Sequence, residues 1–163
     1  MPPKDTGMTL VETVVTLALA GVLMTIGFVS VRNFLIAGRE QGTAVQIRSA
    51  LRNAEEQALS QGRTYCVYFT STTWATYKSD CTVAADKTNG PSQVADPSIQ
   101  LGSIAFPAPS PAIPGQSTAC PAAGACAYFY PRGTALAGTL RVVRPGKTYT
   151  LTVEGLTGRV SLA

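Results

Sequence analysis

One glutamate stands alone in an apolar stretch near the start of the chain. Residues 8–31 (MTLVETVVTLALAGVLMTIGFVSV) contain a single charged side chain, Glu12. As a helix this stretch would extend roughly 36 Å at about 1.5 Å per residue, which is enough to cross a bilayer. A carboxylate in such a helix costs about 2.5–3.5 kcal/mol near the centre of the bilayer. Because a charged residue with such a cost is usually retained for a function, Glu12 is a candidate functional residue.

Cysteines are the other reactive side chains. All of them follow the apolar stretch, and none lies in the Cys-x-x-Cys spacing of a redox or metal motif. An even number of cysteines after an export-type segment favours two disulfides and an oxidising compartment. We therefore expect the rest of the chain to lie outside the cytoplasm. The cysteines are Cys66, Cys81, Cys120 and Cys126.

The composition argues against catalysis. The chain has no histidine, which excludes histidine-based general bases, catalytic triads and most zinc sites. It also has no nucleotide-binding loop and no recognisable pair of catalytic carboxylates. Asp80, Asp86 and Asp96 match no calcium-loop spacing, so we expect them to be solvated loop residues. We predict a protein that is not an enzyme and that uses no metal or cofactor.

The apolar stretch predicts a helix that continues well beyond it. Residues 32–62 contain no proline, and apolar residues recur there at spacings of three and four, which places them on one helix face. Gly62 is a typical C-terminal stop. We predict one helix from residue 8 to about residue 60, whose second half packs its apolar face on a β-domain. The apolar face consists of Ala44, Ile47, Leu51, Ala54 and Ala58.

The remaining residues, 63–163, predict a β-rich domain. RTYCVYFTSTTWATYKSDC (63–81) alternates aromatic and small residues around TSTT, which predicts a hairpin. Residues 82–125 are rich in proline and loop-like, and only residues 98–106 predict a strand there. After residue 125, the turn sequences PRG, RPGK and GLTG separate three or four predicted strands.

The first hairpin suggests a disulfide pairing. A turn at Thr73 and Trp74 would place Cys66 opposite Cys81 as a cross-strand bridge. Cys120 and Cys126 would then pair across the short loop PAAGA. Four cysteines allow three pairings, and the sequence leaves the other two open.

A cleaved secretory signal peptide is the alternative interpretation of the N-terminal stretch. The sequence ALA at residues 18–20 satisfies the small-residue rule for signal peptide cleavage. However, the apolar run continues to residue 31, and Glu12 would interrupt a short hydrophobic region. Positive charges on both flanks do not settle the orientation in a membrane.

The motif G-M-T-L-V-E, residues 7–12, resembles the cleavage motif of type IV prepilins and type II secretion pseudopilins. In that family a prepilin peptidase cuts after the glycine, here Gly7, and methylates the new amino terminus, here Met8. The resemblance implies that residues 1–7 are a leader peptide and residues 8–31 a transmembrane helix segment. Glu12, the fifth residue of the mature chain, would serve assembly by neutralising the terminal amine of a neighbouring subunit.

The same resemblance implies a location and partners. The chain would be a single-pass protein of the inner membrane with its β-domain outside the cytoplasm, and would then join an extracytoplasmic filament. Its partners would be other pilins or pseudopilins, the prepilin peptidase, the inner-membrane assembly platform and membrane lipid.

The C-terminal strands extend the resemblance. An aromatic strand into YPRG, then GTLRVV, then YTLTVEGLTGRVSL is similar to the GspH/FimT group of pseudopilins and minor pilins. That group commonly carries a glycine–arginine pair after a turn, matched here by Gly158 and Arg159. The implied fold is α+β and type IV pilin-like, with a long N-terminal helix, amphipathic over residues 32–62, packed on a small antiparallel β-domain over residues 63–163. The implied function is a structural subunit, a minor pilin or pseudopilin, of a type IV pilus or type II secretion pseudopilus.

An excess of positive charge near the C-terminus raises DNA binding as an alternative function. Residues 127–163 carry five basic residues against Glu154 alone, and five minus one is +4. Some FimT-like minor pilins bind DNA during natural transformation through basic residues at this end. In that subgroup a further arginine follows the glycine–arginine pair, whereas here Arg159 is followed by residues 160–162, VSL. We therefore expect only marginal DNA binding. The basic residues are Arg132, Arg141, Arg144, Lys147 and Arg159.

Overall fold

The computed structural model describes residues 9–107 and 120–163, with only the backbone described at helix residues 26–33 and 36–37. The chain divides into two compact units, Met1–Gly38 and Arg39–Ala163. The helices of the described residues are α1 (Leu10–Gln61) and the short 3-10 helix η1 (Ala84–Asp86). The strands are β1 (Tyr65–Phe69), β2 (Thr73–Lys78), β3 (Lys87–Gln93), β4 (Gln100–Ala105), β5 (Ala125–Phe129), β6 (Gly138–Arg144), β7 (Lys147–Val153) and β8 (Val160–Leu162).

Both ends of α1 carry a recognisable cap. The Thr9 hydroxyl accepts a hydrogen bond from the Glu12 N–H at 3.3 Å, and the Thr9 carbonyl accepts one from the Thr13 N–H at 3.2 Å. This is the pattern of an N-cap residue. At the other end Gly62 has a φ of +60°, the left-handed conformation that commonly closes a helix. The predicted helix is confirmed, with its ends shifted by one or two residues.

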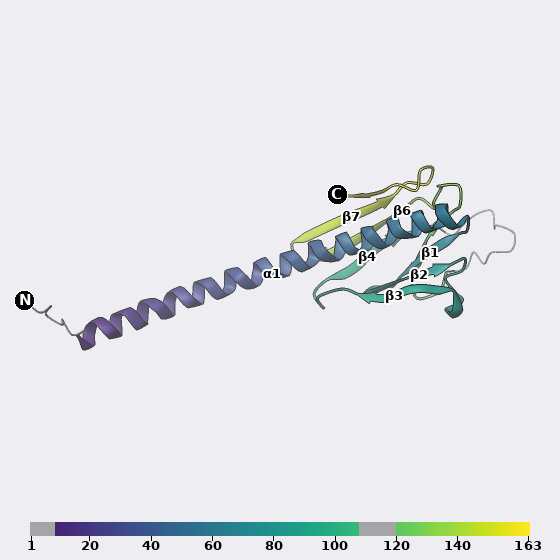
Figure 1. Ribbon diagram of the computed structural model, residues 1–163. Helices are drawn as coiled ribbons and strands as arrows, with labels where there is room; N and C mark the ends of the chain where they lie inside the picture. Colours follow the sequence, from purple (N-terminus) through teal and green to yellow (C-terminus); the bar gives the residue numbers. More distant parts are fainter. Residues whose placement is uncertain (1–8, 108–119) are drawn as a thin grey trace, which may run out of the picture. The chain divides into compact units, whose positions relative to one another are not determined.

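The strands form two antiparallel four-stranded sheets. The first sheet has the order β3-β2-β1-β5, and the second has the order β4-β6-β7-β8. The C-terminal half of α1 runs along both sheets within the Arg39–Ala163 unit (Figure 1). The strand predicted at residues 98–106 corresponds to β4, and the strands predicted after residue 125 correspond to β5, β6, β7 and β8.

The main core lies between α1 and the two sheets. All members of the predicted apolar helix face, Ala44, Ile47, Leu51, Ala54 and Ala58, are 0% exposed. They share one cluster with Val67 and Phe69 of the first sheet and with Leu140 and Leu151 of the second. The predicted α+β fold, a long helix packed on an antiparallel β-domain, is therefore confirmed.

The first hairpin turns earlier than predicted. Phe69 pairs with Trp74, so the turn lies at residues 70–72 rather than at Thr73 and Trp74. The Thr70 hydroxyl fixes this turn, because it accepts a hydrogen bond from the Thr73 N–H at 3.0 Å. As a result Cys66 lies opposite Tyr77, and the prediction that it lies opposite Cys81 in the strand ladder was wrong.

Strand β3 was not predicted. Its sequence, KTNGPSQ, shows neither the alternation nor the β-branched residues of a typical strand. It forms because β2 supplies a partner, and it lies at the edge of its sheet. An edge position tolerates Pro91, which has no N–H to donate to a ladder.

No helical stretch among the described residues is both long and apolar enough to cross a membrane. The predicted transmembrane segment, residues 8–31, includes Met8 and the side chains of residues 26–31, which lie outside the described residues.

Candidate functional site

The predicted assembly site begins at the start of α1. Gly7 and Met8, the predicted cleavage and methylation residues, lie outside the described residues. Glu12 is exposed and occupies the third helical position after the Thr9 cap. A carboxylate in the first turn interacts favourably with the partial positive charge of a helix N-terminus. Among the described residues, the Glu12 carboxylate makes no ion pair.

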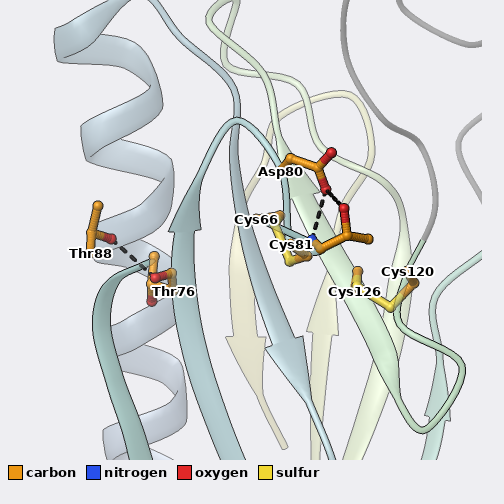
Figure 2. Close-up of a disulfide and its surroundings, with 8 residues drawn as sticks. Cys66, Thr76, Asp80, Cys81, Thr88, Cys120 and Cys126 are labelled. Atoms are coloured by element: carbon orange, nitrogen blue, oxygen red, sulfur yellow. Dashed lines mark hydrogen bonds between the residues drawn. A yellow bond between two sulfur atoms is a disulfide. The ribbon is translucent and has the colours of Figure 1, made fainter. Parts of the chain in front are cut away.

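The four cysteines form two disulfides on one face of the first sheet. Cys66 bonds to Cys81 at 2.05 Å and Cys120 to Cys126 at 2.06 Å, the predicted pairing. Figure 2 shows the two bonds close together. Cys66 lies between Tyr65 and Val67 of β1, which both face the main core, so strand alternation turns its side chain to the opposite face.

A buried tyrosine packs against these disulfides. Tyr128 of β5 packs in the same cluster as Cys66 and Cys126 and is 3% exposed. Burial, followed by the charge of Asp80 and by Tyr130, raises the pKa of Tyr128 to about 12. Asp80 itself accepts hydrogen bonds from the Thr82 N–H at 2.7 Å and hydroxyl at 2.8 Å (Figure 2), which close a turn around Cys81. This aspartate therefore has a local structural role.

The basic residues proposed for DNA binding do not gather on one surface. Arg144 lies beside Glu40 of α1, whereas the turn that carries Arg132 packs near Leu59. These helix positions are separated by roughly 29 Å at about 1.5 Å per residue. Arg141 lies on the exposed face of β6, between the inward-facing Leu140 and Val142. The turns of Arg132 and Arg159 touch, since Gly133 and Gly158 are in close contact. Lys147 of β7 lies opposite Arg144 in the β6–β7 ladder.

Arg144 is committed to a buried ion pair that the sequence did not reveal. Its Nε donates to Oε2 of Glu40 at 3.0 Å, and the Glu40 side chain is 0% exposed. The two residues are 104 positions apart in the chain. This pair fastens the end of β6 to α1, so Arg144 is not a free phosphate ligand.

A second ion pair lies one residue earlier on the helix. Arg39 donates to Oδ2 of Asp96 at 3.1 Å and thereby joins α1 to the loop between β3 and β4. The other Asp96 oxygen accepts hydrogen bonds from the backbone N–H and hydroxyl of Ser98 at 2.9 and 2.7 Å. The bonds from Ser98, with a smaller contribution from Arg39, lower the pKa of Asp96. Arg39 and Glu40 thus join the start of the packed part of the helix to the β3–β4 loop and to the end of β6.

Comparison with known proteins identifies the family. The family model described as type II transport protein GspH matches residues 43–157, which is more than half of the chain. The chain belongs to the GspH family. A second model, the prokaryotic N-terminal methylation motif, matches residues 2–28 and so contains the Gly7–Met8 junction and Glu12. Members of the GspH family are structural pilin or pseudopilin subunits, not enzymes. They are anchored in the membrane by the N-terminal helix and form extracytoplasmic filaments.

Solved structures support the GspH fold. The minor pseudopilin EpsH from the type 2 secretion system of Vibrio cholerae matches with a TM-score of 0.52 and 14% identity, over 77% of this chain and 96% of that chain. The type IV minor pilin FimU of Pseudomonas aeruginosa matches with a TM-score of 0.52 and 15% identity, over 80% of this chain and 92% of that chain. At these identities the likeness concerns the fold. No curated protein sequence matches the chain.

In the glycine–arginine pair of this GspH-family chain, Gly158 has a packing role. Gly158 has a φ of +66°, and a Cβ placed there would lie 3.1 Å from both Oε1 of Glu55 and the Gly133 carbonyl oxygen. A glycine at this position therefore lets the loop after β7 approach α1 closely without strain. Burial, partly offset by Arg52, raises the pKa of the Glu55 carboxyl. Arg159, by contrast, is exposed.

Arg39, Glu40 and Glu55 are helix residues whose contacts the sequence did not predict. The position of Glu40 carried a signal, because it lies four residues before Ala44 on the buried helix face. A charge in line with a buried face calls for a partner, although the sequence does not say that the partner is Arg144.

Proposed function

We propose that this GspH-family chain is made as a precursor, is cut between Gly7 and Met8 by a prepilin peptidase, and joins a type II secretion pseudopilus or a type IV pilus as a minor subunit. The match of residues 2–28 to the N-terminal methylation motif carries the proposal, because it stands directly before the GspH region. Before assembly the chain is held in the inner membrane by residues 8–31, with its disulfide-bonded domain outside the cytoplasm. Its partners are other pilins or pseudopilins, the peptidase, the assembly platform and membrane lipid.

Glu12 supplies the chemistry of assembly in this proposal. Cleavage after Gly7 creates a free amine at Met8, which is a positive charge close to the membrane. The exposed Glu12 of an incoming subunit neutralises the amine of a neighbour already in the filament. Pairing the two charges offsets part of the cost that each has in lipid.

Intact-mass analysis of the membrane-extracted protein tests the processing step. The mature chain should begin at Met8 and carry one added methyl group. A Gly7→Ala variant should remain at the precursor mass, because the peptidase requires the glycine. A native chain that begins at Gly21 would instead support the signal-peptide interpretation and contradict the proposal.

Substitution of Glu12 tests the assembly step. Glu12→Ala should still be inserted and cut, yet it should be lost from purified filaments. Glu56→Ala is the matched control, since it removes an exposed glutamate from the same helix. Filaments that contain Glu12→Ala at the native level would show that this carboxylate is not the assembly residue.

A DNA-binding minor pilin of a natural-transformation pilus is the alternative proposal. It draws on the basic residues, of which Arg132 and Arg159 have turns in contact and Lys147 lies opposite the ion-paired Arg144. A few free cations make few phosphate contacts, so we expect weak binding with a shallow salt dependence.

A further inference from the structure

An uncharged pocket lies between α1 and the edge of the first sheet. Its volume is about 230 Å³, and no residue that lines it is charged. It is separate from both ion pairs and from the disulfide cluster. The pocket-lining residues that bear on its chemistry are Gln46, Ser49 and Asn53 of α1, Trp74 of β2, and Asn89 and Ser92 of β3.

An irregularity in the ladder between β2 and β3 aims two polar side chains into this pocket. In a regular strand, residues three apart such as Asn89 and Ser92 would point to opposite faces. Here Asn89 pairs with Thr76 and Ser92 pairs with Trp74, with a register shift between them. Since Trp74 and Thr76 lie two apart, they share a face, and their partners lie on that face too. Such bulges are common beside functional sites.

The Gly90 backbone makes this irregularity compatible with close packing. Gly90 has a φ of +95°, and a Cβ there would lie 2.9 Å from the Trp74 carbonyl oxygen. On the other side of the bulge, the Thr88 hydroxyl donates to the Thr76 carbonyl at 3.2 Å (Figure 2). These contacts hold β3 in place, so the pocket wall is preformed.

The helix contributes the opposite wall. Gln46, Ser49 and Asn53 follow a spacing of three and four, which places them on one side of α1. All three are exposed. Within the part of the chain that the structure describes, their side chains have no hydrogen-bond partner in the protein. They are therefore available to a ligand.

The chemistry of the lining selects a class of ligand. Side-chain amides offer a donor and an acceptor together, and hydroxyls offer either, so this set matches neighbouring hydroxyl groups on one molecule. Trp74 adds an apolar wall although it is only 4% exposed. The absence of charge from the lining gives no counter-ion to an anionic or cationic ligand. The volume equals that of roughly eight water molecules at about 30 Å³ each, which suits one small ring rather than a drug-sized molecule.

We propose that this pocket binds a neutral saccharide, with one sugar ring held between the amides of α1 and β3 against Trp74. The proposal does not depend on which filament the subunit joins. It gives the subunit a ligand site on the side of the helix that faces β3.

Trp74 provides a direct readout, since it is the only tryptophan of the chain. The full-length protein, in a detergent without a sugar headgroup, is titrated with glucose, N-acetylglucosamine and their β-1,4-linked dimers. We expect a saturable change in tryptophan emission with a Kd of about 1 mM or lower for at least one of them. Saturation-transfer NMR on the same sugars detects binding that leaves the emission unchanged.

Pocket variants give the decisive comparison. Ser49→Leu fills the pocket from an exposed helix position and should abolish binding, whereas Ser60→Leu, exposed on the same helix outside the pocket, should bind as the native chain does. Asn53→Ala and Asn89→Ala should each weaken binding about two- to tenfold, as expected for loss of one or two hydrogen bonds. The proposal is overturned if neither method detects binding of a neutral saccharide, or if Ser49→Leu binds as well as Ser60→Leu.

Discussion

The ion pair between Glu40 and Arg144 should respond very differently to removal of its two partners. The Glu40 side chain is 0% exposed, while that of Arg144 is 20% exposed. Within the described residues, Oε2 of Glu40 meets Arg144 and Oε1 has no hydrogen-bond partner. Among the described residues, Arg144 is therefore the only cation paired with this carboxylate, which is shielded from water.

This asymmetry sets the expected magnitudes. Arg144→Met leaves the buried carboxylate unpaired and should cost about 3–5 kcal/mol of unfolding free energy. Glu40→Met leaves a guanidinium whose long side chain can reach water, so its cost should be about 1–2 kcal/mol. With both residues replaced by methionine, the site becomes apolar, and the double variant should lie within about 1 kcal/mol of the native chain. The two costs are thus expected to be strongly non-additive.

Urea unfolding of a soluble fragment that starts at residue 34, followed by Trp74 emission, measures these values. The fragment keeps several helical residues before Arg39. In thermal unfolding, Arg144→Met should lower Tm by roughly 10–20 °C. The reasoning is refuted if the two single variants cost the same, if their costs add in the double variant, or if Arg144→Met costs less than about 1 kcal/mol.

Three further outcomes follow from the packing and the charges. Gly158→Ala should cost about 1–3 kcal/mol in the same urea assay, because the new Cβ adds a close contact with Glu55 to the strain of a positive φ. Gly146→Ala is the control and should cost less, since Gly146 has a φ of +87° and open space around it. Equal costs would show that the contact with Glu55 contributes nothing. Glu55 has a raised pKa in the folded chain, so its contribution to stability is complete below about pH 4.5 and is lost as the pH rises through the folded pKa. Glu55→Gln should therefore gain stability relative to the native fragment towards neutral pH, by less than about 1 kcal/mol because the group is partly exposed. A gain confined to acidic pH would contradict this prediction. The logarithm of the DNA-binding constant, plotted against the logarithm of the salt concentration, should have a slope no steeper than about −2. Binding should be abolished in the Arg132→Ala, Arg159→Ala double variant and should vanish near physiological ionic strength. Sub-micromolar binding at physiological ionic strength would make DNA uptake the leading function.

Local patterns in the sequence were sufficient for the helix and for the C-terminal strands. The buried face of α1 could be predicted because its spacing depends only on helix geometry, and every residue of that face is buried. Gly62 and the turn sequences also act locally, and so they marked real boundaries. Glu12 could be recognised because a charge within an apolar run is a local anomaly.

Features that depend on partners distant in the chain could not be predicted. Strand β3 exists because β2 pairs with it, and its own residues do not favour a strand. The first hairpin shifted because the single Thr70 hydroxyl selected the turn. Glu40 needed the position of Arg144, far along the chain, before its role was visible. The pocket at Trp74 likewise depends on a bulge that aligns Asn89 with Ser92.

The placement of the disulfides determines which contacts would carry a mechanical load. Both disulfides lie in the cluster on the outer face of the first sheet, and α1 packs on the main core without a covalent cross-link to either sheet. A pulling force applied along α1 from its N-terminal side would first reach the ion pairs of Arg39 and Glu40, and would then shear the apolar face from Ala44 to Ala58. The resistance of α1 to being pulled away from the sheets would thus be set by the rate at which these noncovalent contacts break. Reducing agents should change this resistance little.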